Sequence, residues 1–124
     1  MKLSLSEEVF AICRLAADSP VPGWALAGSL YSITRTADEL SVVCPQDQTP
    51  EETRADRGWR CMKVHGPLAF SMTGIMASLV VPLADARIGV FVFSTFDTDY
   101  LMVKESDLER AIRALIDAGH EVER

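Results

Sequence analysis

The polar side chains best placed for chemistry gather in one short segment, Ser94–Asp99, which includes the carboxylates of Asp97 and Asp99. Two apolar runs, Val90–Phe93 and Tyr100–Val103, flank the segment, and this pattern predicts two strands joined by a turn. A polar turn between buried strands is a good place for a binding site. Ser, Thr and Asp are also ordinary turn residues, because their side chains satisfy nearby backbone groups. Taken alone, the hairpin is explained better by turn structure than by a site.

A second set of small polar residues, Ser71–Gly74, precedes a segment with helical periodicity. The apolar residues that recur on one face of this expected helix are Ile75, Met76, Leu79, Val80 and Leu83. We expect Ser71 or Thr73 to cap the first turn, and Gly74 leaves the free N–H groups unobstructed. Pro82 should kink or end the helix. Because the chain has no GxGxxG or P-loop motif, an ordinary N-cap remains an alternative to a binding site.

The cysteines and histidines predict neither a catalytic site nor a metal site. Cys13, Cys44 and Cys61 are far apart in the sequence and lie in apolar runs, which is typical of small buried side chains in a reducing compartment. On a strand, the spacing of Cys61 and His65 separates their Cα atoms by about 13 Å, too far for a nucleophile and its base. Cys61 and His65 could bind a metal only together with Cys44 and His120, and nothing in the spacing of these four residues suggests such a site. We therefore expect no catalytic residue, no metal and no cofactor.

The composition limits the classes of partner. A chain of 124 residues with 48% hydrophobic residues is expected to bury an ordinary globular core. The net charge of −6 and the lack of a basic run argue against a nucleic-acid partner, which needs clustered Lys and Arg. There is no leader pattern near the start and no apolar run of the roughly 20 residues that span a bilayer, so we expect no membrane partner and a cytoplasmic location.

The N-terminal part of the chain is predicted to be mostly strand. The expected strands are Val9–Leu15, Tyr31–Thr36 and Leu40–Cys44, of which the last two form a hairpin. Trp24–Ala27 follows a Pro- and Gly-rich break and is expected to form one short helical turn. Pro45–Gly58 contains no large apolar residue, so we expect a solvent-exposed connection there.

Residues 59–123 predict the order strand, helix, strand, strand, helix, strand. The outer strands are Trp59–Val64 and His120–Glu123, and the second helix should start at a capping box formed by Ser106 and Glu109 and stop at Gly119. This βαββαβ order is the split arrangement of the ferredoxin-like α+β fold. We therefore divide the chain into residues 1–58, with a polar connection at 45–58, and a complete unit at 59–124.

Three segments point to a family. They are Tyr31–Glu39, Ile75–Leu83 and Ser94–Leu108, and they closely resemble the ACT-domain family, in particular small bacterial ACT-like proteins related to the Castor-type cytosolic arginine sensors. The resemblance implies an ACT fold in which a degenerate N-terminal ACT-like unit packs with the complete C-terminal one. It also implies a regulatory module that binds a free amino acid. Since the sensors carry several such units in one chain, a homodimer would supply any further interface here, with a regulated protein as a further partner.

The resemblance also implies where the amino acid binds. The corresponding positions here are Ser71, Met72, Thr73, Gly74, Ile75, Thr95, Phe96 and Asp99. Their chemistry suits a zwitterion, because open N–H groups at Gly74 and Ile75 favour a carboxylate and Asp99 can pair with an ammonium. The side chain of Phe96 could pack on the aliphatic part of the ligand.

Three classes of function remain open at this point. The first is a non-catalytic amino-acid-binding regulator, and the second is a dimerisation or protein-interaction module with a vestigial pocket. The third, a small enzyme, is the least favoured, because no His or Cys has a partner at workable spacing and the two carboxylates are better explained by capping and ligand charge. The second class would gain support if exposed apolar residues filled the gap between Gly74 and Asp99.

Overall fold

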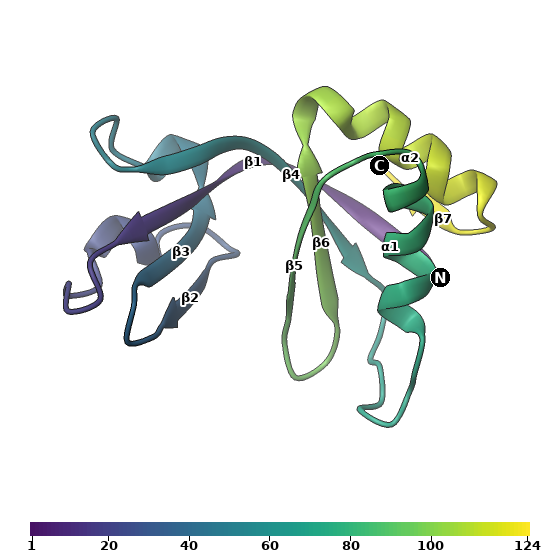
Figure 1. Ribbon diagram of the computed structural model, residues 1–124, viewed down its shortest axis with the longest axis horizontal. Helices are drawn as coiled ribbons and strands as arrows, with labels where there is room; N and C mark the ends of the chain where they lie inside the picture. The colour runs from purple at the N-terminus through teal and green to yellow at the C-terminus, as the bar shows by residue number, and fades with distance from the viewer. The chain divides into compact units, whose positions relative to one another are not determined.

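The computed structural model describes residues 1–124, which form seven strands, two α-helices and three 3-10 helices (Figure 1). The strands are β1 (Lys2–Leu15), β2 (Ser32–Arg35), β3 (Leu40–Pro45), β4 (Ala55–Val64), β5 (Val90–Ser94), β6 (Asp99–Lys104) and β7 (Glu121–Glu123). The helices are η1 (Gly23–Leu26), η2 (Gln46–Gln48), α1 (Ile75–Asp85), η3 (Glu105–Asp107) and α2 (Leu108–Asp117). None of these helices has both the length and the apolar character that a bilayer crossing requires.

The chain divides into two compact units. The N-terminal unit consists of residues 8–59, and the C-terminal unit consists of residues 1–7 and 60–124. Strands β1 and β4 are long enough to contribute residues to both units. The predicted division after residue 58 placed the first seven residues in the other half. They belong to the C-terminal unit because Leu3 is fully buried in its core.

The N-terminal unit has the strand order β2-β3-β1-β4, with β3 antiparallel to both β1 and β2. The 3-10 helices η1 and η2 stand where a ferredoxin-like unit has its two α-helices, so the order is strand, helix, strand, strand, helix, strand in a shortened form. Pro22 and Pro45 immediately precede these two helices, which are four and three residues long. The predicted β2–β3 hairpin and the short helical turn near Trp24 are confirmed.

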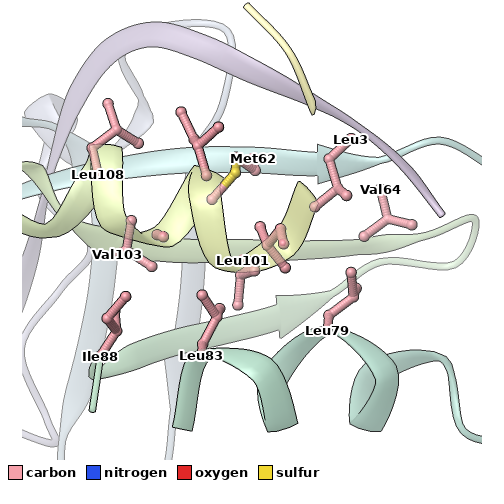
Figure 2. Packing of buried hydrophobic residues seen from close by; sticks show 12 residues of the cluster. Leu3, Met62, Val64, Leu79, Leu83, Ile88, Leu101, Val103 and Leu108 are labelled. Atoms are coloured by element: carbon pink, nitrogen blue, oxygen red, sulfur yellow. The ribbon is translucent and has the colours of Figure 1, made fainter. Parts of the chain in front are cut away.

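The C-terminal unit carries both α-helices on one face of its sheet. Figure 2 shows the buried side chains that α1, α2 and the strands direct toward one another. They include Leu79 and Leu83 from α1, Leu108 and Leu115 from α2, Met62 and Val64 from β4, and Leu101 and Val103 from β6. Alternate residues of each strand point to this core, as a half-buried sheet requires. The predicted ferredoxin-like α+β fold of this unit is confirmed.

One strand is added to the expected ferredoxin-like sheet. The order in the C-terminal unit is β7-β1-β4-β6-β5, so β7 pairs with β1 rather than with β4. This pairing is parallel, with Leu3 opposite Val122. The sequence predicted a strand only from Val9, whereas β1 begins at Lys2. The alternation of Leu3 and Leu5 with Ser4 and Ser6 explains why the strand extends that far.

The starts of both α-helices differ from the predictions. Helix α1 begins at Ile75 behind Gly74, which has φ +76° and makes no side-chain capping bond, so the expected caps from Ser71 or Thr73 are wrong. A left-handed N-cap is open to glycine because it lacks a Cβ. Ser106 lies inside η3, and α2 begins two residues later, so the expected capping box is wrong as well.

Helix α1 continues to Asp85 although Pro82 lies inside it. Proline has no N–H, so the carbonyl of Ser78, four residues earlier, loses its helical donor. His120 Nε2 lies 2.9 Å from that Ser78 oxygen and replaces the missing bond. A carbonyl can only accept, which places the proton on Nε2 of His120. The helix therefore does not end at Pro82, which was one of the two outcomes expected there.

Candidate functional site

A pocket of about 190 Å³ opens between two loops of the C-terminal unit. One loop connects β4 to α1, and the other is the tip of the β5–β6 hairpin. The lining residues are Leu68, Ala69, Phe70, Met72 and Ile75 from the first loop and the start of α1, and Ser94, Thr95, Phe96, Asp97, Thr98 and Asp99 from the hairpin. The hairpin itself is as predicted, with Val90 opposite Val103 and Ser94 opposite Asp99.

Two hydrogen bonds fasten the two loops to each other. The backbone N–H of Leu68 donates to the carbonyl of Asp97 over 2.7 Å. The hydroxyl of Thr98 donates to the carbonyl of Val64, the last residue of β4, over 2.6 Å. Thr98 is only 5% exposed, so this bond is shielded from water and its loss would be costly. The pocket walls are therefore held at a defined separation.

The hairpin tip is organised by its own polar side chains. The backbone N–H of Thr95 donates to the carbonyl of Thr98 over 2.8 Å, which closes the turn. The hydroxyl of Ser94 donates to Oδ1 of Asp99 over 2.5 Å. This charge-assisted bond fixes the half-buried Asp99 carboxylate beside the pocket while engaging one of its two oxygens.

Two aromatic rings stand at the pocket and connect its walls. Phe70 and Phe96 pack edge to face with ring centroids 5.1 Å apart. Both are strongly exposed, at 78% and 80%, and Met72 beside them is 48% exposed. Large apolar side chains with this much exposure are unusual on a surface unless they meet a ligand or another protein.

The structure brings five of the eight predicted site residues to the pocket. Met72, Ile75, Thr95, Phe96 and Asp99 line it. The remaining three, Ser71, Thr73 and Gly74, lie in the loop before α1 but are not among the lining residues. The helix begins later than expected, which leaves these three residues ahead of its first turn.

Six lining residues were missed by sequence reasoning: Leu68, Ala69, Phe70, Ser94, Asp97 and Thr98. Those of the hairpin were recognised as turn residues but not as a pocket wall. Those of the first loop lie between the expected strand Trp59–Val64 and the segment Ser71–Gly74, and no role was predicted for them. The presence of Leu68 and Phe70 in a segment between two regular elements was the available signal, since connections on the surface are usually polar.

The electrostatic character of the pocket comes from two carboxylates and a helix start. Asp97 and Asp99 line the pocket together with apolar side chains, and the lining includes no Lys, Arg or His. The first helical bond of α1 runs from the N–H of Ser78 to the carbonyl of Gly74. The N–H of Ile75 therefore lacks an intrahelical acceptor and can face an anionic group.

The residues considered for catalysis are placed apart from this pocket. Cys61 is buried in β4, and burial raises the pKa of its thiol to about 12, which disfavours the nucleophilic thiolate. His65 forms a hydrogen bond through Nε2 with the hydroxyl of Ser4. The structure shows no group of three or more His, Cys, Asp or Glu residues positioned to hold a metal ion.

Solved structures resemble the whole fold. The chain is 47% identical to protein Atu0741 from Agobacterium tumefaciens, over 98% of this chain and 90% of that one, with a TM-score of 0.93. It is 12% identical to the regulatory subunit of aspartate kinase from Thermus thermophilus, over 94% of this chain and 97% of that one, with a TM-score of 0.66. The second likeness is one of fold alone.

Curated relatives and family models identify the family. The chain is 28% identical to cytosolic arginine sensor for mTORC1 subunit 1 from Bos taurus over 96 residues, which are 68% of this chain and 29% of that protein. The matches cover between 18% and 56% of the length of the curated relatives. A model described as an N-terminal domain matches residues 8–52, and the ACT-domain model matches residues 54–117, half of the chain. The chain belongs to the ACT-domain family.

Proposed function

We propose that this chain is a non-catalytic regulatory module that binds a free amino acid between the Ser71–Ile75 helix start and the Thr95–Asp99 hairpin loop. The observation that carries the proposal is the pocket itself, which takes lining residues from both of these segments. Its volume of about 190 Å³ is below the range of about 300–1,000 Å³ that is usual for drug-sized ligands, and so suits a molecule as small as an amino acid.

The two charges of an amino acid find complementary groups in the lining. One oxygen of Asp99 accepts from Ser94, which leaves the other for the ligand ammonium. The N–H of Ile75 is available to the ligand carboxylate, and Met72 and Phe96 offer apolar surface to the side chain. Charged hydrogen bonds contribute about 1.5–3 kcal/mol each, so three or four of them support micromolar affinity after the cost of association.

The family supports a regulatory rather than a catalytic role. The bovine relative is named as an arginine sensor. We carry over from this name the sensing of an amino acid, with its identity left open. Such a module would pass its signal to a regulated protein or across a homodimer.

A thermal-shift screen against the twenty amino acids tests the proposal. A ligand present at about a hundred times its dissociation constant stabilises the folded state by about 2.7 kcal/mol and raises the melting temperature. We expect one amino acid, or a few of related chemistry, to do so. If none of the twenty shifts the transition at millimolar concentration, the protein is not a sensor of free amino acids.

Asp99→Asn tests the assignment of the ammonium partner. The substitution removes the negative charge but keeps an oxygen that can accept from Ser94, so the fold should persist. We expect the ligand-induced shift to disappear. Asp85→Asn is the matched control, because Asp85 is exposed at the end of α1 and does not line the pocket. A full shift in Asp99→Asn would show that another group binds the ammonium.

The exposed aromatic pair favours a second candidate, a dimerisation or protein-interaction module whose pocket is vestigial. Phe70 and Phe96 lie in the gap between the two loops and present apolar surface outward. Sedimentation equilibrium separates this candidate from the first. The interaction module predicts that the protein self-associates, that Phe96→Ser weakens this association, and that no amino acid shifts the melting temperature. The sensor predicts that an amino acid does shift the melting temperature, whether or not the protein self-associates.

A further inference from the structure

Two of the three cysteines lie side by side in the N-terminal unit. Cys13 is on β1 and Cys44 is on the neighbouring antiparallel strand β3. The register places Cys13 opposite Val42 and Cys44 opposite Ala11, so the two cysteines are diagonal neighbours two positions apart along the ladder. Both thiols are free, and both side chains belong to the same buried cluster, with 1% and 0% exposure.

A threonine hydroxyl joins the two thiols. Thr49 follows η2, and its Oγ1 lies 3.3 Å from the Sγ of Cys44 and 3.9 Å from the Sγ of Cys13. All three residues belong to the N-terminal unit. The two sulfurs and the Thr49 hydroxyl therefore form a small polar cluster within the apolar core of this unit.

The ionisation of the pair is uneven. The pKa of Cys44 is lowered, chiefly because the Cys13 thiol donates a hydrogen bond to its sulfur, with Thr49 adding to the effect. The pKa of Cys13 is raised, because its proton is held in that hydrogen bond and its surroundings are desolvated. The hydrogen bond between the two thiols favours the thiolate of Cys44, whereas Cys61 has no such neighbouring thiol and burial alone raises its pKa.

We propose that Cys13 and Cys44 form a reversible modification site at which a peroxide converts the two neighbouring thiols into a disulfide. The Cys44 sulfur attacks one peroxide oxygen, which breaks the O–O bond, gives a sulfenic acid and releases the first water. The Cys13 sulfur then attacks the sulfenic sulfur and forms the S–S bond. The sulfenic hydroxyl leaves with the Cys13 proton as the second water. The two thiols lose two electrons and two protons, and hydrogen peroxide takes them up as two waters.

Peptide mapping can identify this bond without ambiguity. Trypsin cleaves after Lys and Arg, so the three cysteines fall in three different peptides: residues 3–14, 36–54 and 61–63. The full chain is exposed to hydrogen peroxide, its remaining thiols are blocked with N-ethylmaleimide under denaturing conditions, and the digest is analysed without reduction. We expect peptides 3–14 and 36–54 to appear joined, with the Cys61 peptide blocked. Dithiothreitol added before the blocking step should restore both free thiols.

Single substitutions make the result specific to the pair. Cys13→Ala and Cys44→Ala should each abolish the joined peptide, whereas Cys61→Ala should leave its yield unchanged. Thr49→Val should slow its formation at least several-fold, because the hydroxyl that supports the reactive sulfur is gone, and Thr49→Ser should restore the rate. The proposal is wrong if wild-type protein yields links that involve Cys61, links between two chains, or a sulfinic acid at Cys44 in place of the joined peptide.

Discussion

At the scale of single residues, Thr98 connects the fold to the pocket. Its buried hydroxyl donates to the carbonyl of Val64, and its backbone carbonyl closes the hairpin turn through Thr95. Thr98→Val keeps the shape of the side chain but removes the donor. Because this leaves a buried carbonyl without its partner, we expect the free energy of unfolding to fall by about 1–3 kcal/mol in urea titrations.

Thr98→Ser provides the matched control, since it retains the donor and loses only a methyl group. We expect it to be more stable than Thr98→Val. Hydrogen exchange offers a second measurement, because the N–H of Leu68 is protected by the carbonyl of the adjacent Asp97 and should exchange faster in Thr98→Val. Equal stability of Thr98→Val and the wild type would mean that the Val64 carbonyl finds another donor.

At the scale of elements, the bond from His120 to α1 compensates for a proline. Because Pro82 cannot donate to the carbonyl of Ser78, the His120 ring supplies that donor from beyond the end of α2. His120→Ala should therefore destabilise the wild type by about 1 kcal/mol or more. In a Pro82→Ala background the new backbone N–H can take over the Ser78 carbonyl, and the same substitution should cost less.

A double-mutant cycle measured by urea unfolding tests this coupling. The two substitutions should be non-additive by roughly 0.5–1.5 kcal/mol, with the double variant more stable than the sum of the single effects implies. An additive result would mean that the contact between His120 and Ser78 contributes nothing to the stability of α1.

A pair of charges links α2 to the residue that follows β7. Arg124 donates from both terminal nitrogens to the two carboxylate oxygens of Glu109, over 2.6 and 3.0 Å. The hydrogen bond from Arg124 holds the pKa of Glu109 below its ordinary value of 4.5. A carboxyl whose pKa is lowered by folding stabilises the protein above its unfolded pKa, and this contribution is lost as the pH falls through the folded value.

Glu109→Gln should therefore be slightly less stable than the wild type at neutral pH, and the difference should vanish as the pH falls below 4.5. Both side chains are exposed, so the effect will be small and will weaken with added salt. Urea unfolding at several pH values measures it, and Glu51→Gln serves as a control with an exposed carboxylate in the other unit. A difference that grows on acidification would contradict this account.

At the scale of the whole molecule, local patterns were enough to predict most elements. The hairpin of β5 and β6, the stripe that became α1 and the stop of α2 at Gly119 were all predicted, because each depends on residues close in the sequence. The pairing of Leu3 on β1 with Val122 on β7 could not be predicted in the same way. Their pairing joins opposite ends of the chain, and only the three-dimensional sheet brings them together.

The candidate site was predicted in part for the same reason. Asp99 and Phe96 belong to a hairpin whose turn chemistry is visible in the sequence, and the family resemblance directed attention to Met72 and Ile75. Phe70 was missed because its role depends on contact with Phe96, from a different loop. The predicted N-cap of α1 was wrong because Gly74 occupies that position in place of Ser71 or Thr73. The preferences of single residues for N-cap positions do not decide between these neighbours.

The sharing of β1 and β4 leads to a prediction about cooperativity. Each of these strands is continuous and supplies residues to both units, so loss of either unit would leave half of both strands without its partners. We expect the chain to unfold in one transition. Two probes can test this separately, because Trp24 and Trp59 lie in the N-terminal unit whereas α1 and α2 lie in the C-terminal unit.

Tryptophan fluorescence should therefore follow the N-terminal unit, and circular dichroism at the helical wavelength should follow the C-terminal unit. The two urea midpoints should coincide in the wild type. They should also move together in Leu3→Ala, which removes a fully buried side chain from the C-terminal core and should cost about 2–5 kcal/mol. Leu26→Ala is the control, since Leu26 is half exposed. If Leu3→Ala shifts only the dichroism midpoint, the two units fold independently and the shared strands do not couple them.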